Sequence, residues 1–379
     1  MRRVLAFTLL LSVCAAAASC DRDRPYRIGV VLDADGVYAA REAARAVNAG
    51  GGIHGHLLEL QTVGGASSTS ARVALEAAET LAADPAVLAV VGHTNSSASL
   101  AASQVYNARH VTQIAPTSST PLYSRAGPYS FRLVASDAYQ GAFLAHQVLD
   151  SSPRPRTAVV YVNDDYGRAL AGVLLRDLHA AGSDPVYATP YVESDSFPDG
   201  GAIAAAVVRA NPAVLIWIGR AAHFARVAPE VRRALPSLTV LASDGFGGPA
   251  VVHDSLHVLA GTRYVRFVDL SRRDAALSRL LDHYREHGLG EPTDQAVLAY
   301  DAVLLLAEAM ARTGANRDAI RAWLASVGHS TPAFHGLSGP IAFVAGGDRA
   351  PAYVLGRVPD MGMAMSATNA RQRAPRTIP

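Results

Sequence analysis

Short apolar runs alternate with longer amphipathic stretches along most of the chain. The first cycles predict strands at 27–32, 56–63, 87–91 and 111–114, and helices at 38–47, 70–83 and 97–109. The alternation resumes with strands at 157–162, 185–192, 213–218 and 239–241, and helices at 167–181, 202–210 and 223–234. Strands that alternate with helices form parallel sheets covered on both faces, so two series predict two α/β domains.

The pattern changes towards the C-terminus. Two helices are predicted at 293–313 and 317–326, and the apolar segments 339–344 and 352–358 predict a final β-hairpin. The remaining stretch, 359–379, is polar and contains several Arg and Pro residues. We expect this tail to be disordered.

The first residues have the pattern of an export signal. Arg2 and Arg3 precede an apolar run at 4–13, which is shorter than the roughly 20 residues that span a bilayer. Small residues then lead to Cys20, as in a bacterial lipoprotein cleavage site. We therefore predict a signal peptide at 1–19 and lipidation of Cys20, with plain secretion as the alternative. The protein is expected in the periplasm or at the cell surface, with membrane contact through this lipid only.

Charge and cysteine content narrow the class of protein. The chain has 34 basic residues, all arginine, and 32 acidic residues. Without the predicted signal peptide, which contains Arg2 and Arg3, the net charge is zero, and a general nucleic-acid binder needs a basic surface. Cys14 lies in the signal and Cys20 is the predicted lipid site, so no intrachain disulfide is expected.

Motifs for metals, cofactors and catalysis are absent from the sequence. Asp33-Ala34-Asp35-Gly36 lacks the later ligands of a calcium loop, and His54 and His56 have no partner at a zinc-binding spacing. There is no phosphate-binding loop that ends in Lys and no G-x-S-x-G nucleophile turn. We predict no metal, no cofactor and no enzymatic activity.

Several loop and helix segments resemble one protein family in order and spacing. They are VNAGGGIHG at 47–55, VVGHTNSS at 90–97, IAPTSSTP at 114–121, FRLVASD at 131–137 with QG at 140–141, DYG at 165–167 and AYDAVLLLAEA at 299–309. Together they resemble the leucine/isoleucine/valine-type (branched-chain amino-acid) solute-binding proteins of ABC transporters. The resemblance covers nearly the whole chain after the signal peptide.

The resemblance implies a type I periplasmic-binding-protein fold, with two Rossmann-like lobes of parallel sheets joined by three crossovers. The crossovers are expected near Ala135, Thr262 and Phe334. This gives lobe 1 the ranges 20–135 and 263–333, and lobe 2 the ranges 136–262 and 334–358.

The resemblance also implies a ligand site in the loops after the strands, where open α/β sheets bind ligands. In the family, the serine aligned with Ser96 binds the ligand carboxylate at a helix N-terminus, and we place Asn95 in the same site. Thr117 is implied to bind through its backbone and Ser119 through its hydroxyl. The alternatives are a simple helix cap at Ser96 or Ser97 and an ordinary turn before Pro121.

Three further residues complete the expected site. Tyr166 is implied to contact the ligand body, and Asp244 to pair with its ammonium group. The alternative for Tyr166 is a half-exposed aromatic residue at a helix start, and the alternative for Asp244 is a solvated aspartate in a turn. Arg220 departs from the tyrosine common in the family; it can bind a second carboxylate, point to solvent or pair with Asp244. The short loop with Asp33 and Asp35 can place these carboxylates at the cleft.

These features predict a solute-binding lipoprotein of an ABC importer. It is expected to capture an amino acid or similar small polar ligand between closing lobes, as a monomer, and to dock on a membrane permease. A ligand-sensing receptor component with the same fold is the alternative. An enzyme on this scaffold is the third possibility that we considered.

Overall fold

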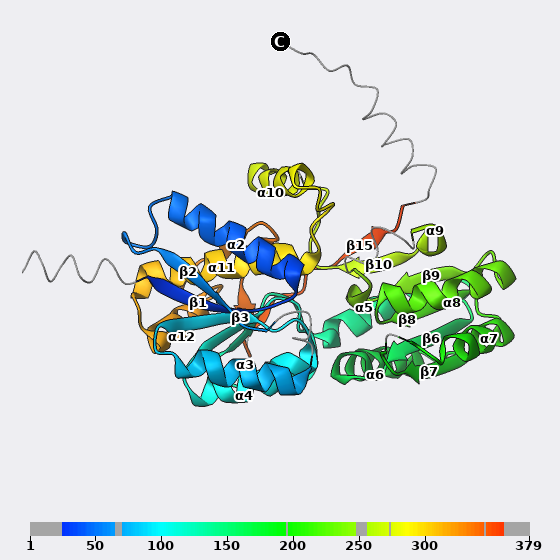
Figure 1. Cartoon of the computed structure of the whole chain (residues 1–379). Helices are drawn as coiled ribbons and strands as arrows, with labels where there is room; N and C mark the ends of the chain where they lie inside the picture. The colour runs from blue at the N-terminus through cyan, green and yellow to red at the C-terminus, as the bar shows by residue number, and fades with distance from the viewer. Residues whose placement is uncertain are drawn as a thin grey trace, which may run out of the picture. The chain divides into compact units, whose positions relative to one another are not determined.

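The computed structural model describes residues 25–64, 70–194, 196–247, 256–272, 274–344 and 346–359 (Figure 1). The predicted signal peptide, Cys20 and residues 360–379 of the predicted tail lie outside these ranges. The chain divides into two compact units. Unit 1 comprises Met1–Ser118, Leu122–Leu133 and Gln295–Ala350, and unit 2 comprises Ser119–Pro121, Val134–Asp294 and Pro351–Pro379.

Unit 1 contains a five-stranded parallel sheet in the order β2-β1-β3-β4-β5. The strands are β1 (Tyr26–Val31), β2 (Leu58–Thr62), β3 (Val87–Gly92), β4 (Thr112–Ala115) and β5 (Ser130–Arg132). The helices are α2 (Ala34–Ala49), α3 (Ala71–Ala83), α4 (Ser96–Ala108), the 3-10 turn η1 (Pro121–Arg125), α11 (Asp294–Thr313) and α12 (Arg317–Ser326). Every residue of β3 is buried, as expected for a parallel strand covered on both faces.

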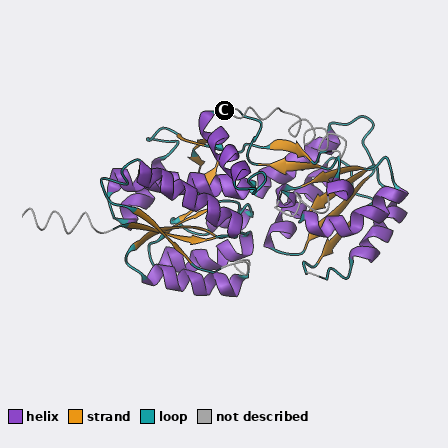
Figure 2. Cartoon of the chain, turned by 45° about the horizontal axis from the view of Figure 1, so that its top comes forward, coloured by secondary structure: helices purple, strands orange, loops and turns teal. Residues whose placement is uncertain are grey.

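Unit 2 contains a six-stranded sheet in the order β15-β10-β9-β8-β6-β7, in which only β15 is antiparallel to its neighbour. The strands are β6 (Thr157–Val162), β7 (Tyr187–Tyr191), β8 (Val214–Ile218), β9 (Thr239–Ala242), β10 (Arg263–Arg266) and β15 (Val354–Arg357). The helices are α5 (Asp137–Leu149), α6 (Asp165–Ala180), α7 (Gly200–Ala210), α8 (Ala221–Ala234), η2 (Asp244–Phe246), α9 (Leu256–Leu259) and α10 (Ala275–Glu286). In Figure 2, helices flank the strands within each unit.

The eight strands expected from the two apolar series all form, each within two residues of its expected ends. The helix expected at 38–47 begins four residues earlier, because the Asp33 carboxylate caps α2 by accepting from the Gly36 amide at 2.9 Å. The short first loop is therefore mostly the start of a helix.

The expected C-terminal hairpin between 339–344 and 352–358 is wrong. β12 (Gly339–Ile341) pairs with β11 (Phe334–Gly336), and β13 (Phe343–Val344) pairs with β14 (Asp348–Arg349). β15 instead pairs with β10 in unit 2. The segments separate because the chain passes from unit 1 to unit 2 between Ala350 and Pro351.

The units also differ from two of the expected lobe ranges. The passage between Leu133 and Val134 lies close to the expected crossover at Ala135. Residues 263–294, however, group with unit 2, because β10 pairs with both β9 and β15. Residues 334–350 group with unit 1, where Arg349 donates to the carbonyls of Leu133 and Ser338 at 3.3 and 3.1 Å.

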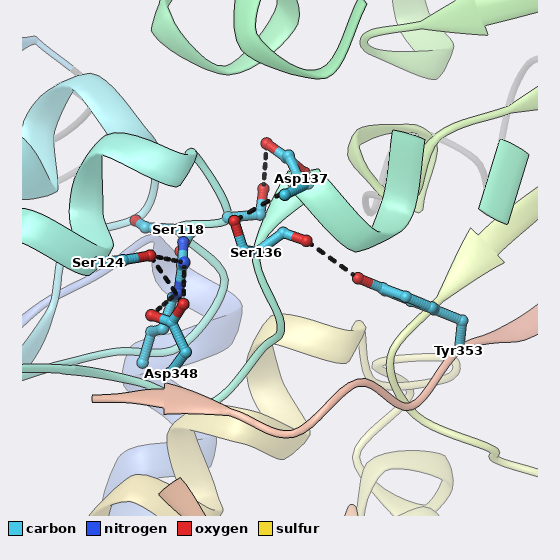
Figure 3. A network of polar contacts seen from close by, with 9 residues as sticks. Ser118, Ser124, Ser136, Asp137, Asp348 and Tyr353 are labelled. Atoms are coloured by element: carbon cyan, nitrogen blue, oxygen red, sulfur yellow. Dashed lines mark hydrogen bonds and ion pairs between the residues drawn. The ribbon is translucent and has the colours of Figure 1, made fainter. Parts of the chain in front are cut away.

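A buried ion pair in unit 1 ties together segments that lead out of the unit. The Arg132 side chain is fully buried and makes two parallel bonds to Asp348, Nε to Oδ1 and an Nη to Oδ2, each 2.7 Å. Its other Nη donates to the Ser118 carbonyl at 3.2 Å. Figure 3 shows Ser124 on the same carboxylate, where its hydroxyl donates at 2.7 Å. Beyond the passage, in unit 2, the Tyr353 hydroxyl donates to the Ser136 carbonyl at 3.2 Å (Figure 3).

Candidate functional site

The expected site residues fall into two groups, one in each unit. Asn95, Ser96 and Thr117 belong to unit 1, at the carboxyl ends of β3 and β4. The residues that belong to unit 2 are Ser119, Tyr166, Arg220 and Asp244.

The loop after β3 begins helix α4, and Asn95 caps it. The Asn95 side chain accepts from the Ala98 amide at 2.9 Å, and Ser96 is the first helical residue, with 3% of its surface exposed. The alternative that Ser96 or Ser97 is the cap is therefore wrong. The first turn of a helix of this length presents backbone N–H groups and a partial positive charge, which favour an anion.

The loop after β4 lies against the same region of unit 1. The Thr117 hydroxyl is 3.3 Å from the Thr94 carbonyl and 3.4 Å from Gln295 Oε1, so it can donate to either. Gln295 lies in the first turn of α11. The loops after β3 and β4 and the start of α11 are therefore joined by one hydroxyl.

A buried polar cluster lies beneath these loops. The Ser99 and Ser118 hydroxyls are 2.6 Å apart, and the His93 amide donates to Ser99 Oγ at 3.1 Å. The His93 ring is fully buried, with Nε2 3.3 Å from the Tyr106 hydroxyl. Burial lowers the pKa of His93 to about 3, so the ring is neutral at physiological pH.

We expect His93 to make the free energy of unfolding depend on pH. Between its ordinary pKa of 6.5 and the folded-state pKa of about 3, the unfolded chain binds a proton that the folded protein does not bind. Stability is therefore lost as the pH falls through this range, by up to about 1.4 kcal/mol per pH unit. Urea unfolding of wild type and His93→Gln from pH 7 to pH 4 should show a shallower dependence in the variant.

The exposed residue His335 provides the control for this measurement. The His335→Gln variant is expected to follow the wild-type dependence on pH. Parallel loss of stability in wild type and His93→Gln would show that the buried ring does not contribute.

In unit 2, Ser119 is directed towards the start of α5. Its hydroxyl donates to Asp137 Oδ2 at 3.1 Å, its carbonyl accepts from the Asp137 amide at 2.8 Å, and its side chain is fully buried. Asp137 in turn accepts from Gln140 Nε2 at 3.2 Å, and Gln140 Oε1 accepts from the Asp244 amide at 3.1 Å. A continuous set of hydrogen bonds thus links Ser119 to Asp244.

Tyr166 and Asp244 lie together at the ends of β6 and β9. The Tyr166 hydroxyl is 2.6 Å from Asp244 Oδ1 and 2.7 Å from Ser243 Oγ, and it accepts from the Gly245 amide at 3.2 Å. Burial raises the pKa of the Tyr166 hydroxyl, and the nearby Asp244 charge raises it further. The hydroxyl is therefore a neutral donor that holds the carboxylate in place.

The pKa of Asp244 is also raised, first by burial. Hydrogen bonds from Tyr166 and Gln140 and the charge of Arg220 oppose this shift by stabilising the ionised form. The residue is only partly exposed, at the carboxyl end of β9. The alternative of a solvated turn aspartate is therefore wrong.

Close packing places Tyr166 at the start of α6. A Cβ atom at the next residue, Gly167, would lie 1.9 Å from the Val162 carbonyl oxygen, so only glycine allows this approach to β6. Asp164 caps the helix by accepting from the Gly167 amide at 2.7 Å. The alternative of a half-exposed aromatic is wrong, because Tyr166 is 7% exposed.

Arg220 follows β8 and lies near these acidic groups. Its Nε is 3.5 Å from Glu193 Oε1, and its charge opposes the burial that raises the pKa of both Asp164 and Asp244. The described contacts therefore give Arg220 an ion pair with Glu193, which was not among the sequence alternatives, and no direct pair with Asp244. Sequence reasoning missed Gln140 and Glu193; the QG pair at 140–141 was noticed only as part of a family motif.

The unit 2 group is more acidic than basic. The carboxyl ends of β6, β7, β8 and β9 carry Asp164, Glu193, Arg220 and Asp244. This edge of the unit 2 sheet favours a ligand that has a cationic group and a nearby anionic group.

Among the described residues, no group of three or more His, Cys, Asp or Glu side chains is arranged to hold a metal ion. Nor does any helix in these ranges have the length and apolar character needed to cross a membrane.

Comparison with known proteins agrees with the fold. The sequence model of the periplasmic binding protein family matches residues 25–355. The chain therefore belongs to the periplasmic binding proteins, a family of extracytoplasmic substrate-binding proteins. Its fold is the type I periplasmic-binding-protein fold, as the resemblance implied.

Individual relatives agree with this assignment. The Leu/Ile/Val-binding protein homolog 1 of Brucella abortus (strain 2308) is 28% identical over 322 residues, which cover 81% of this chain and 83% of that protein. The branched-chain amino acid transporter substrate-binding protein LivJ of Streptococcus pneumoniae, solved with isoleucine, superposes with a TM-score of 0.78 at 21% identity, covering 88% and 96% of the two chains.

Another structural neighbour has a different ligand. The solute-binding protein of an ABC transporter from Rhodopseudomonas palustris BisB5, solved with 3,4-dihydroxybenzoic acid, has a TM-score of 0.76 at 16% identity. The match covers 88% of this chain and 93% of that one. The fold alone therefore does not determine the ligand class.

Proposed function

We propose that this protein captures an amino acid outside the cytoplasm and delivers it to an ABC permease. Asp244 is the residue that binds the ligand ammonium group, with Tyr166 beside it. The helix start at Asn95 and Ser96 binds the ligand carboxylate, with Thr117 and Ser119 as further contacts. Selectivity for an amino acid then comes from fixing both charges of the ligand in a site that excludes water.

The observation that carries this proposal is the state of the Asp244 carboxylate. A carboxylate has about four acceptor positions. The Tyr166 hydroxyl bonds Asp244 Oδ1 at 2.6 Å, and Gln140 and the Gly245 amide also interact with this carboxylate, which leaves at least one acceptor position for a ligand. A partly buried, oriented carboxylate with remaining acceptor capacity is suited to an ammonium group, since a charge-assisted hydrogen bond contributes about 1.5–3 kcal/mol.

The relatives support the same ligand class. The names of the Brucella and Streptococcus proteins refer to leucine, isoleucine and valine or to branched-chain amino acids. We carry over the shared α-amino-acid part of these ligands, because it is the part that Asp244 and the α4 start recognise. The side chain of the ligand is a separate question.

We further propose that Cys20 carries the lipid anchor and that the protein acts as a monomer.

Uptake of the labelled ligand by a deletion strain, complemented with wild type or Cys20→Ala, tests the transport role. Restored uptake with wild type supports delivery to a permease. Unchanged uptake in the deletion strain, with lost chemotaxis or signalling towards the ligand, would instead support the sensing alternative.

A further inference from the structure

The guanidinium group of Arg220 has unused hydrogen-bonding capacity. Arginine has five N–H donors in a planar fork. Within the described residues, the side chain of Arg220 makes no hydrogen bond, and its ion-pair partner is Glu193, whose Oε1 lies 3.5 Å from Nε. Its side chain is 36% exposed, and that of Glu193 is 44% exposed, so this pair is weak.

Two other arginines, Arg132 and Arg266, have side chains that are fully or mostly buried and bound to acceptors. Arg132 directs all its nitrogens to Asp348, Ser118 and Ser124. Arg266 directs Nε and an Nη to Asp294, at 3.0 and 2.6 Å. Arg220 differs from these structural arginines, because its guanidinium group makes no hydrogen bond to the described residues.

The backbone fixes where this fork lies. The Arg220 amide donates to the Tyr191 hydroxyl at 3.3 Å, and its carbonyl accepts from Trp217 Nε1 at 3.2 Å. A Cβ at the preceding Gly219 would lie 2.0 Å from the Tyr191 hydroxyl, so the chain passes close to this ring. These contacts do not involve the Arg220 side chain, which can be replaced without removing them.

Arg220 and Asp244 lie at the carboxyl ends of neighbouring strands. β8 pairs with β9 in parallel, so both residues are on the same edge of the unit 2 sheet. The Arg220 charge opposes the burial that raises the pKa of Asp244, so the two groups share one electrostatic environment. This edge therefore offers a site for a cation at Asp244 and a site for an anion at Arg220.

We propose that the ligand is an amino acid with an acidic side chain, whose distal carboxylate binds the Arg220 fork. This inference rests on the proposed function, since it assumes that the ammonium group binds Asp244. A carboxylate matches the planar fork in a bidentate arrangement, and the weak Glu193 contact is displaced or shared when it binds. Neutral side chains leave the fork without a partner.

Calorimetric titration with glutamate, aspartate, glutamine, leucine and glutarate tests this inference on wild type, Arg220→Met and Arg168→Met. Arg168 is the matched control, because it is an arginine of the same region that pairs with Asp165 and is 53% exposed. We expect glutamate or aspartate to bind wild type at least tenfold more tightly than glutamine or leucine. Arg220→Met should weaken the acidic ligand about 10- to 100-fold and leave glutamine and leucine unchanged, whereas Arg168→Met should change none of them.

Other results would overturn the inference in distinguishable ways. Tighter binding of leucine or glutamine than of glutamate, unchanged in Arg220→Met, leaves the proposed function intact and removes the acidic ligand class. An equal loss for every amino acid in Arg220→Met assigns the fork to the α-carboxylate instead. Binding of glutarate alone supports the Arg220 site and contradicts the amino-acid function, and no binding by any of the ligands contradicts both.

Discussion

Replacing Asp348 with asparagine is expected to lower the free energy of unfolding by about 3–5 kcal/mol, because the substitution leaves the Arg132 charge buried without its counter-ion. Arg132 is fully buried and Asp348 is 5% exposed, and two bonds of 2.7 Å join them. A buried charge that loses its partner keeps its desolvation cost and loses the attraction that offset it. Urea unfolding followed by circular dichroism measures the loss.

Two variants make this test specific. Glu308→Gln removes one partner of an exposed ion pair, in which the Arg312 and Glu308 side chains are 66% and 37% exposed, and is expected to cost less than about 1 kcal/mol. The double variant Arg132→Met/Asp348→Leu removes both charges and should recover much of the loss. A cost below about 1 kcal/mol for Asp348→Asn would contradict the assigned role of the pair.

The ion pair also lies beside the segments through which the chain leaves unit 1. Arg132 precedes the passage between Leu133 and Val134, and Asp348 precedes the passage between Ala350 and Pro351. The Arg132 fork also binds the carbonyl of Ser118, the last residue before another passage. The ion pair thus orders three segments by which the chain leaves unit 1.

Asp244→Asn is expected to weaken binding of the amino-acid ligand at least tenfold. The substitution keeps the size of the side chain and an oxygen that can accept from Tyr166, but it removes the charge that attracts the ammonium group. The loss of a charge-assisted hydrogen bond of about 1.5–3 kcal/mol corresponds to roughly 10- to 100-fold in Kd. Calorimetric titration of wild type and variant with the same ligand measures it.

A neighbouring acid provides the control. Asp165 has a side chain that is 36% exposed and pairs with Arg168, and Asp165→Asn is expected to change the affinity by less than about twofold. Because the pKa of Asp244 is raised, wild-type affinity should also fall as the pH is lowered towards that pKa. Equal affinity of wild type and Asp244→Asn at every pH would contradict the assignment of the ammonium site.

The alternation of apolar and amphipathic segments was enough to predict the central strands of both sheets. These strands are buried on both faces, so they appear in the sequence as continuous apolar runs. β5 and β10 were missed because SFR and RYVR are short and carry arginines. Their strand character depends on pairing with β4, β9 and β15, which no local pattern contains.

The division of the second half between the two units also could not be derived from local patterns. Whether residues 263–294 belong to one unit or the other depends on a pairing between β10 and β15, which are about ninety residues apart in sequence. The C-terminal hairpin was predicted from two neighbouring apolar segments, a local signal. In the structure, the contacts of each segment within its own unit decide where it lies.

The sequence pointed only to candidate loops for the site, because strand-end loops are where such sheets bind ligands. Tyr166 and Asp244 were placed in one site through a family resemblance, and the structure brings their side chains into contact. The polar residues that hold them were not predicted. Gln140 lies in the first turn of α5, and its contact with the Asp244 amide joins residues that are 104 positions apart in the sequence.

The most direct test of the central claim is thermal unfolding of the purified protein in the presence of each standard amino acid. A ligand at roughly 100 times its Kd adds about 2.7 kcal/mol of stability to the folded state. We predict that at least one free amino acid raises the melting temperature, and that its N-acetyl derivative, which lacks the ammonium group, does not. A shift produced only by ligands without an ammonium group would contradict the proposed amino-acid-binding function.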